Sequence, residues 1–178
     1  MMKLMLKNKS ARLLFGVFAF LLLSGAAFSK DAGPTSVVYQ VYKDYGWQAL
    51  FSYDRESYQA LGRPLAYQPK KILVRYFDEE LANLLVQNTR WSINHPGDQS
   101  DLDFDMIFAS QDTAASDLKI TDAGNGKVNV EYTYPPDGQK IKLMFLTRKV
   151  KNKWRITDID YGYKRTLKEI LADQTLIP

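Results

Sequence analysis

The strongest constraint on the fold is the regular alternation of apolar and polar residues in the second half of the chain. In segment 127–134, apolar side chains occupy every second position. This two-residue period is typical of a strand with one buried face. The turn sequence Asn125-Gly126 precedes the segment, and the run PPDG at 135–138 follows it. The pattern therefore predicts consecutive hairpins, and hence an antiparallel meander.

The first half of the chain has a helical period instead. Helices are expected over about 37–45, from about 69 onward, and after 78 as far as the run NHPG at 94–97. Strands are expected at 118–121, 127–134, 141–147 and 154–161, followed by a short helix at about 166–171. Helices followed by an antiparallel meander predict an α+β fold, with N-terminal helices packed on one face of a curled antiparallel sheet.

Residues suited to helix starts support these helices. Thr35 or Ser36 is expected to be the N-cap of the first helix, and Pro69 suits the first position of the second. Asp78 is expected to cap the third helix. The acidic Glu79 and Glu80 would follow in its first turn, where the positive end of the helix dipole stabilises negative charge.

The N-terminal segment has the layout of a signal peptide. Basic residues come first, at Lys3, Lys7, Lys9 and Arg12, and an apolar run follows at 13–23. Ala27 and Ser29 fit the small residues of a cleavage site before Lys30. The apolar run is shorter than the roughly 20 residues that span a bilayer. We therefore expect a signal peptide at 1–29, a single domain at 30–178, and a periplasmic or secreted protein. An uncleaved membrane anchor is the alternative.

Charge and cysteine content exclude several classes of function. The chain has 24 basic and 20 acidic side chains, and the four leader cations account for the whole excess. The domain after residue 29 is therefore formally neutral, so its composition does not favour a nucleic-acid partner. The absence of cysteine excludes disulfides and thiolate chemistry. With no glycine-rich phosphate loop, we expect no cofactor.

The segment LDFDMIFASQD at 102–112 places three carboxylates among residues suited to a core. If it is extended, Asp103 and Asp105 point to one face, roughly 6–7 Å apart by strand rise. This separation overlaps that of the paired carboxylates of glycosidases, and Asp112 is a possible third member. Gln111 could hydrogen-bond a ligand. Two carboxylates can divide acid and base roles only where their environments separate their pKa values.

A structural role is the leading interpretation of the same segment. Asp105 is placed to cap a turn at 106–109, and Asp103 or Asp112 could accept hydrogen bonds from buried backbone amides. A calcium loop of the EF-hand type is excluded. Counted from Asp103, the sixth residue would be Phe108 rather than glycine, and the twelfth is not glutamate.

Two further features are expected to be structural. The basic segment RKVKNKWR at 148–155 is interpreted as a solvated hairpin turn, with Trp154 filling the core and lysines protecting an edge strand. Binding to an anionic surface or an acidic partner is the alternative. The single histidine, His95, is expected to be exposed in a loop that ends a helix, and no metal site is expected.

Three elements together resemble a bacterial family called domain of unknown function 3828. They are the pattern YF-x-x-x-L at 76–81, the segment LDFDMIFASQD, and WRITDIDY at 154–161 followed by a leucine-containing helix. The resemblance implies a cone-like fold of the nuclear-transport-factor-2 and cystatin-like superfamily, and a pocket in it. Many members are exported or lipid-anchored, but the resemblance implies no particular activity.

Two functions from different classes follow from these observations. The favoured one is an exported, non-catalytic module that binds a small molecule or an exported protein partner, with contact to a membrane only through an uncleaved leader. Its ligand-contacting residues are expected to be Asp103, Asp105, Gln111 and Asp112 at the opening of a pocket, with Trp91 and Tyr161 as apolar walls. The alternative is a carboxylate-dependent periplasmic hydrolase or isomerase, with Asp105 as base and Asp103 or Asp112 as acid.

Overall fold

The structure is a computed structural model that describes residues 33–49, 62–100, 102–162 and 165–174. The elements described below belong to one compact unit of the chain, residues 32–178. The expected signal peptide at 1–29 lies outside the described residues. No described helix has the length and apolar character needed to cross a membrane.

Helix α1 (Thr35–Tyr45) confirms the first expected helix and is followed by the 3-10 turn η1 (Gly46–Ala49). Its buried side chains recur at helical spacing and are Val37, Val38, Val41 and Tyr42. The N-cap expected at Thr35 or Ser36 is wrong, because the cap is Pro34. Proline fixes φ near the helical value, so the helix begins at Thr35, two residues earlier than expected. The Ser36 hydroxyl donates to the Gly33 carbonyl instead, at 2.7 Å.

The second expected helix is shorter than its apolar pattern indicates. It is a single α-helical turn, α3 (Lys70–Leu73), and the separate 3-10 turn η2 (Leu65–Tyr67) precedes it. Pro69 is the N-cap of α3 rather than its first helical residue, because its ψ of 151° is extended. The chain then turns and reaches Phe77, which forms a parallel bridge to Ile156 in the sheet. This long-range pairing ends the helix.

Helix α4 (Glu79–Asn94) begins where the sequence predicts. The Asp78 side chain accepts a hydrogen bond from the Leu81 backbone amide at 3.0 Å, which confirms the expected cap. The second carboxylate oxygen of Asp78 pairs with Arg148 of the sheet at 2.7 Å. Because Asp78 itself is buried, this one residue fixes both the start of α4 and its position beside the third strand.

The second half forms an antiparallel sheet in the order β1-β2-β3-β4, and the sheet of described strands is open. Its strands are β1 (Ser116–Gly124), β2 (Lys127–Tyr134), β3 (Gln139–Val150) and β4 (Lys153–Asp160). Asn125 and Gly126 have positive φ between β1 and β2, as do Lys151 and Asn152 between β3 and β4. Two-residue hairpin turns with positive φ match the twist of the flanking strands, so both of these expected hairpins are confirmed. The third expected hairpin, with its turn at 135–138, is confirmed by the antiparallel pairing of β2 with β3.

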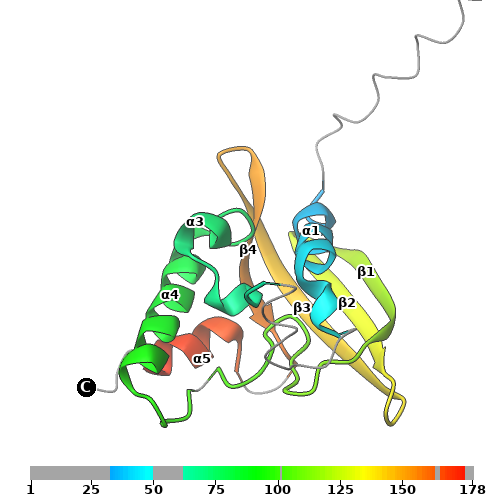
Figure 1. The fold of residues 1–178 in the computed structure, drawn as a ribbon. Coiled ribbons are helices and arrows are strands. Elements are labelled where there is room, and N and C mark those ends of the chain that lie inside the picture. Colours follow the sequence, from blue (N-terminus) through cyan, green and yellow to red (C-terminus); the bar gives the residue numbers. More distant parts are fainter. Residues whose placement is uncertain (1–32, 50–61, 101, 163–164, 175–178) are drawn as a thin grey trace, which may run out of the picture. The chain divides into compact units, whose positions relative to one another are not determined.

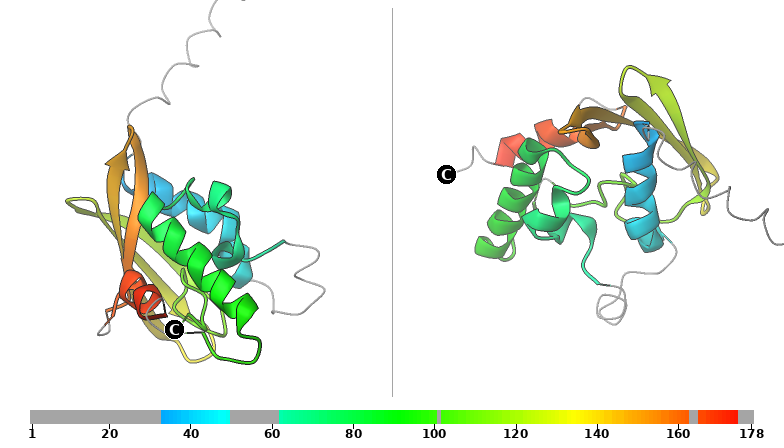
Figure 2. Two further views of the ribbon diagram at one scale, coloured as in Figure 1. Left: turned by 90° about the vertical axis from the view of Figure 1, so that its left-hand side faces the viewer. Right: turned by 90° about the horizontal axis from the view of Figure 1, so that it is seen from above.

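The helices gather on one face of the sheet. Figure 1 and the view from above in Figure 2 show α1 and α4 on the same side of the strands, with α5 (Leu167–Gln174) beside β4 and α4. The fully buried side chains between these layers come from all of them and include Val38, Phe77, Leu81, Phe108, Val130, Phe145 and Ile156. The expected α+β class, with helices on an antiparallel sheet, is confirmed at this level.

The segment between α4 and β1 passes through this core rather than around it. Leu102, Met106, Ile107 and Phe108 are all buried. Irregular backbone usually lies at the surface, because its polar groups need partners when they are buried. The partners found for this segment define the candidate site.

Candidate functional site

The buried loop is built around a tight turn at residues 105–110. The Asp105 backbone amide donates to the Ser110 carbonyl at 2.9 Å, and the Phe108 amide donates to the Asp105 carbonyl at 3.2 Å. Ala109 adopts a left-handed φ of 50°, which reverses the chain. The turn expected at 106–109 is therefore confirmed.

The Asp105 side chain braces this turn. Its Oδ1 accepts hydrogen bonds from the backbone amides of Ile107 at 2.9 Å and Phe108 at 3.2 Å. This is the capping role expected from the sequence. Burial of the carboxyl group raises its pKa to about 6, although both amide hydrogen bonds act to lower it. Asp105 has therefore lost part of its hydration, and the two amide hydrogen bonds hold its carboxyl group in place.

Three tyrosine hydroxyls support the other side of the turn, and we call them the tyrosine tripod: Tyr42, Tyr132 and Tyr161. The hydroxyl of Tyr42 donates to the carbonyl of Ile107, that of Tyr132 to the carbonyl of Phe108, and that of Tyr161 to the carbonyl of Met106, the last at 3.2 Å. The rings of Tyr42 and Tyr132 also meet the Phe108 ring edge to face. Three consecutive carbonyls are thereby paired inside the core.

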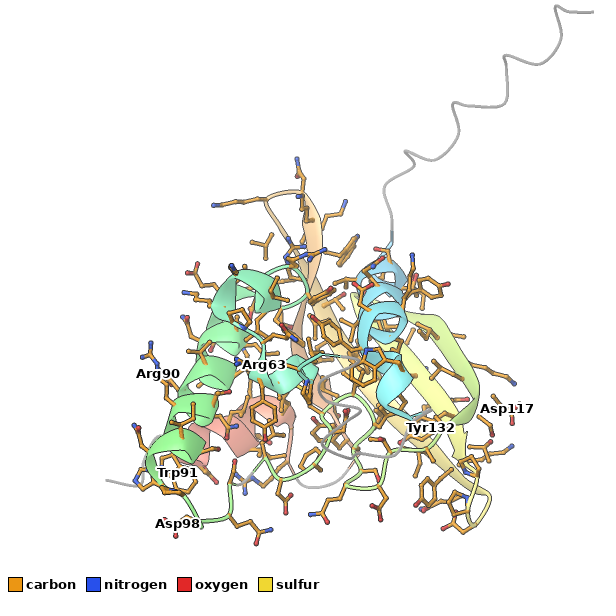
Figure 3. The ribbon with its side chains drawn as sticks, in the orientation of Figure 1. Arg63, Arg90, Trp91, Asp98, Asp117 and Tyr132 are labelled. Carbon is orange, nitrogen blue, oxygen red and sulfur yellow. The ribbon has the colours of Figure 1, made fainter. Side chains whose placement is uncertain are left out.

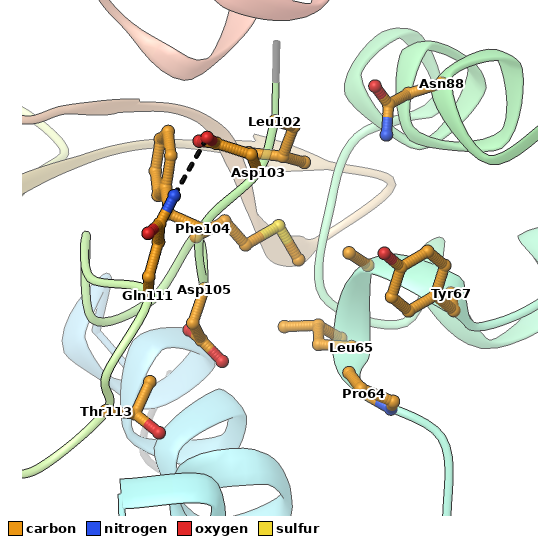
Figure 4. Close-up of a pocket in the computed structure, with 12 residues that line it drawn as sticks. Pro64, Leu65, Tyr67, Asn88, Leu102, Asp103, Phe104, Asp105, Gln111 and Thr113 are labelled. Carbon is orange, nitrogen blue, oxygen red and sulfur yellow. Dashed lines mark hydrogen bonds between the residues drawn. The ribbon is translucent and has the colours of Figure 1, made fainter. Parts of the chain in front are cut away.

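A pocket of about 280 Å³ lies beside the braced turn (Figure 4). Its walls come from η2 and the residue before it, from α4, and from the loop that follows α4. The lining residues are Pro64, Leu65, Ala66, Tyr67, Asn88, Leu102, Asp103, Phe104, Asp105, Met106, Gln111 and Thr113. The lining is mixed, with seven apolar or aromatic residues and five polar or charged ones. Such a site can contact both the apolar body and the polar groups of a small ligand.

Asn88 supplies a buried polar group to this pocket. Only 5% of the residue is exposed, and its Oδ1 accepts from the Ser100 hydroxyl at 2.9 Å. Its Nδ2 has no hydrogen-bond partner among the described residues and points toward the side of the pocket that holds Tyr67 and Leu65 (Figure 4). This donor is open to the pocket, where an acceptor of water or of a ligand can pair with it.

Asp103 and Gln111 form the rim of the pocket. Both side chains are exposed, and Asp103 Oδ2 accepts from Gln111 Nε2 at 2.9 Å and from Gln99 Nε2 at 2.5 Å. Figure 4 shows the pairing of Asp103 with Gln111 across the loop. Asp103, Asp105 and Gln111, all expected as site residues, are therefore brought together.

The structure separates the other expected site residues from this pocket. Asp112 is exposed beside it, and its backbone carbonyl accepts from the Ser110 hydroxyl at 2.9 Å. Tyr161 is buried beneath the loop as a member of the tyrosine tripod. Trp91 lies at the end of α4 near Asp98 (Figure 3), where its ring stacks on His95 at 4.6 Å. None of the three lines this pocket, and their expected contact with a ligand stays a prediction.

His95 and Trp154 differ in detail from their expected environments. His95 is the C-cap of α4 and is half-buried rather than exposed, because its ring stacks on Trp91 and its Nδ1 lies 2.9 Å from the Trp91 carbonyl oxygen. Trp154 is only partly buried. It packs against the edge of the core, and Lys149 lies over its ring at 5.7 Å.

Sequence patterns missed the half of the pocket that comes before the loop. The sequence of segment 64–67 predicts irregular chain, and nothing in it indicates that these residues line a pocket. Asn88, however, follows Leu81 and Leu85 at helical spacing and occupies the same buried face of α4. A polar side chain within an apolar helix stripe was the available signal, because a buried amide needs a partner.

No group of three or more histidine, aspartate or glutamate side chains that could hold a metal ion occurs within the described parts of the chain. No family model, curated protein or solved structure matches the chain. The function is therefore inferred from the geometry of the pocket.

Proposed function

We propose that this protein is an exported, non-catalytic binding module that holds a small ligand in the pocket beside Asp105. The observation that carries the proposal is the fixed position of this carboxylate in a pocket that also has apolar walls. The Asp105 backbone makes two hydrogen bonds, and its Oδ1 accepts two more. A polar group held this firmly can orient a ligand with little further ordering on binding.

The walls of the pocket support the same function. Leu65, Leu102 and Met106 offer buried apolar surface, while Asn88 and Asp105 offer hydrogen-bonding groups. A few polar groups in an apolar pocket give orientation and specificity, while the apolar walls contribute most of the affinity. Its volume of about 280 Å³ suits a small molecule better than a protein segment.

We further propose that the domain has the cone-like arrangement of the nuclear-transport-factor-2 and cystatin-like superfamily, as members of domain of unknown function 3828 are thought to have. The support is an open antiparallel meander with helices on one face. The signal-peptide pattern at 1–29 supports a periplasmic or secreted location. N-terminal sequencing of the exported protein is expected to begin at Lys30, and a protein that retains Met1 would contradict cleavage.

The binding function can be tested by filling the pocket. Gln111→Trp places a bulky ring at the pocket rim, whereas Asp112→Trp places the same ring at the adjacent exposed residue outside the lining. A small-molecule library screened by protein NMR is expected to shift amide signals of residues around the pocket. The Gln111 variant should lose these shifts and the Asp112 variant should keep them. Equal effects of the two variants would contradict binding in this pocket.

A carboxylate-dependent hydrolase or isomerase remains the second candidate, because one observation favours it. Burial raises the pKa of Asp105 to about 6, and Asp103 lines the same pocket. A carboxyl group with such a pKa can exchange protons near neutral pH. In a screen of chromogenic glycosides and esters, an enzyme of this kind would lose turnover in Asp105→Asn. Turnover that survives the substitution would exclude Asp105 as the base.

A further inference from the structure

The charged side chains that line the pocket are all acidic. Two carboxylates, Asp103 and Asp105, line it, and no lysine, arginine or histidine occurs among its described lining residues. Both amide hydrogen bonds to Asp105 end on Oδ1, which leaves Oδ2 without a partner among the described residues. A carboxylate oxygen in an apolar pocket is best satisfied by a donor that carries positive charge.

The opposite side of the pocket needs an acceptor instead. Asn88 of α4 is 5% exposed, its Oδ1 is paired with Ser100, and its Nδ2 is open to the pocket with no acceptor among the described residues. Asp105 belongs to the loop after that helix. Figure 4 shows the two side chains on different walls, with Leu65 and Leu102 among the residues around the space between them. One ligand could therefore meet both groups only if its polar ends are separated by an apolar body.

We propose that the ligand is a small organic cation, with an ammonium group for Asp105 at one end and a hydrogen-bond acceptor for Asn88 at the other. This inference rests on the proposed binding function and names its ligand class. Asp103 adds negative charge at the rim and attracts the cation as it enters. The Tyr67 and Phe104 rings, which also line the pocket, suit an aromatic or aliphatic body and can contact a cation.

The affinity for such a cation should depend on pH. The other titratable residues that line the pocket are Asp103 and Tyr67, and Tyr42 from α1 and Tyr161 after β4 interact electrostatically with Asp105. Burial holds the pKa of Tyr42 and Tyr161 well above the ordinary value, so they stay neutral. Because the pKa of Asp105 is about 6, its ionised fraction rises about tenfold between pH 5 and pH 7, and the affinity for a cation should rise by the same factor.

The test compares three probes of the same shape by isothermal titration of the exported protein at pH 7. They are para-aminomethylbenzamide, which carries an ammonium and an amide carbonyl, neutral para-toluamide, and anionic para-toluate. We expect the cation to bind at least about tenfold more tightly than the neutral probe, and the anion to bind least. Equal or tighter binding of the neutral or anionic probe would overturn the ligand class but not the pocket. No binding of any probe would overturn both proposals.

Variants assign the effect to the named groups. Asp105→Asn keeps an oxygen for the two backbone amides but removes the charge, so it should remove the preference for the cation and the pH dependence. If that variant does not fold, Asp103→Asn should reduce the preference by a smaller factor. Asp112→Asn removes an exposed carboxylate of the same loop outside the pocket and should change nothing. A loss of preference in the Asp112 variant equal to that in the pocket variants would overturn the assignment.

Asn88→Asp tests the other end of the ligand. The substitution keeps an oxygen for the Ser100 hydroxyl but removes the amide donor. Wild-type protein should prefer para-aminomethylbenzamide to benzylamine, which lacks the acceptor, and the variant should lose this preference. An unchanged preference would show that Asn88 does not contact the ligand.

Discussion

Replacing Asp105 by asparagine should stabilise the protein at neutral pH, even though Asp105 braces the buried loop. Asparagine has the shape of aspartate and keeps a side-chain oxygen for the amides of Ile107 and Phe108. It carries no charge, so it avoids the cost of burying an ionised carboxylate. The comparison therefore separates the hydrogen bonds of this residue from its charge.

The size of the effect follows from the pKa of Asp105. Burial raises it from the ordinary value of 3.8 to about 6. Between these two pH values the folded state binds more protons than the unfolded state, so the stability contribution is fully present below about pH 4 and is lost as the pH rises through 6. At about 1.4 kcal/mol per tenfold change, the full loss is about 3 kcal/mol. We treat this figure as an upper limit, because Asp105 retains some solvent exposure.

The assay is urea unfolding of wild type and Asp105→Asn at a series of pH values from 4 to 7.5, followed by circular dichroism. We expect similar free energies of unfolding at pH 4, and a variant that is more stable by about 2–3 kcal/mol at pH 7.5. For a domain of this size, such a gain corresponds to roughly 5–10 °C in melting temperature. Groups that titrate equally in both proteins cancel in the difference.

A difference in stability that stays constant with pH would refute this reasoning, because it would mean that the Asp105 carboxyl is not desolvated in the folded state. Asp103→Asn is the matched control, since it removes an exposed carboxylate from the same loop. Its effect should stay within about 0.5 kcal/mol. Asp105→Ala, which removes the acceptor as well, should destabilise relative to Asp105→Asn by roughly 0.5–2 kcal/mol.

Other substitutions test the loop supports and the helix cap by chemical unfolding at pH 7. Tyr42→Phe removes the hydroxyl that donates to the Ile107 carbonyl and leaves that buried carbonyl unpaired, so it should cost about 1–3 kcal/mol. Tyr39→Phe, at a residue that is 61% exposed, should cost nothing measurable, and equal losses would exclude the hydrogen bond as the cause. Asp78→Ala should cost about 1–2 kcal/mol through the lost cap. Asp78→Asn should cost less, because it keeps the cap acceptor and loses only the charge that pairs with the half-exposed Arg148; a cost equal to that of alanine would contradict a capping role.

Local sequence predicted the parts of the fold that depend on local interactions. The turn at Asn125-Gly126 is set by residues that tolerate positive φ, and the strands beside it are set by alternation. Asp78 caps its helix through a bond to a residue three positions away, so its role could be inferred without tertiary structure. The bracing role of Asp105 was predictable for the same reason.

The composition of the pocket depends on long-range packing and could not be predicted in the same way. Tyr161 was expected as a wall, but its hydroxyl reaches a carbonyl 55 positions earlier and lies beneath the loop. The single-turn α3 ends at a bridge between Phe77 and Ile156, a contact that no local period encodes. Trp91 follows the apolar stripe of α4, yet its ring stacks on His95 at the end of the helix and does not line the pocket.

The tyrosine tripod also constrains the order in which the protein can fold. Its hydroxyls come from a helix before the loop, a strand after it, and the end of the last strand, at separations of 65, 24 and 55 residues. The loop therefore acquires its partners only after the sheet and α1 have assembled, and contacts of such separation form slowly because they close large loops. The braced turn should be among the last regions to become protected from hydrogen exchange during refolding. A ligand that requires this turn would then bind only the fully folded chain and would raise its global stability.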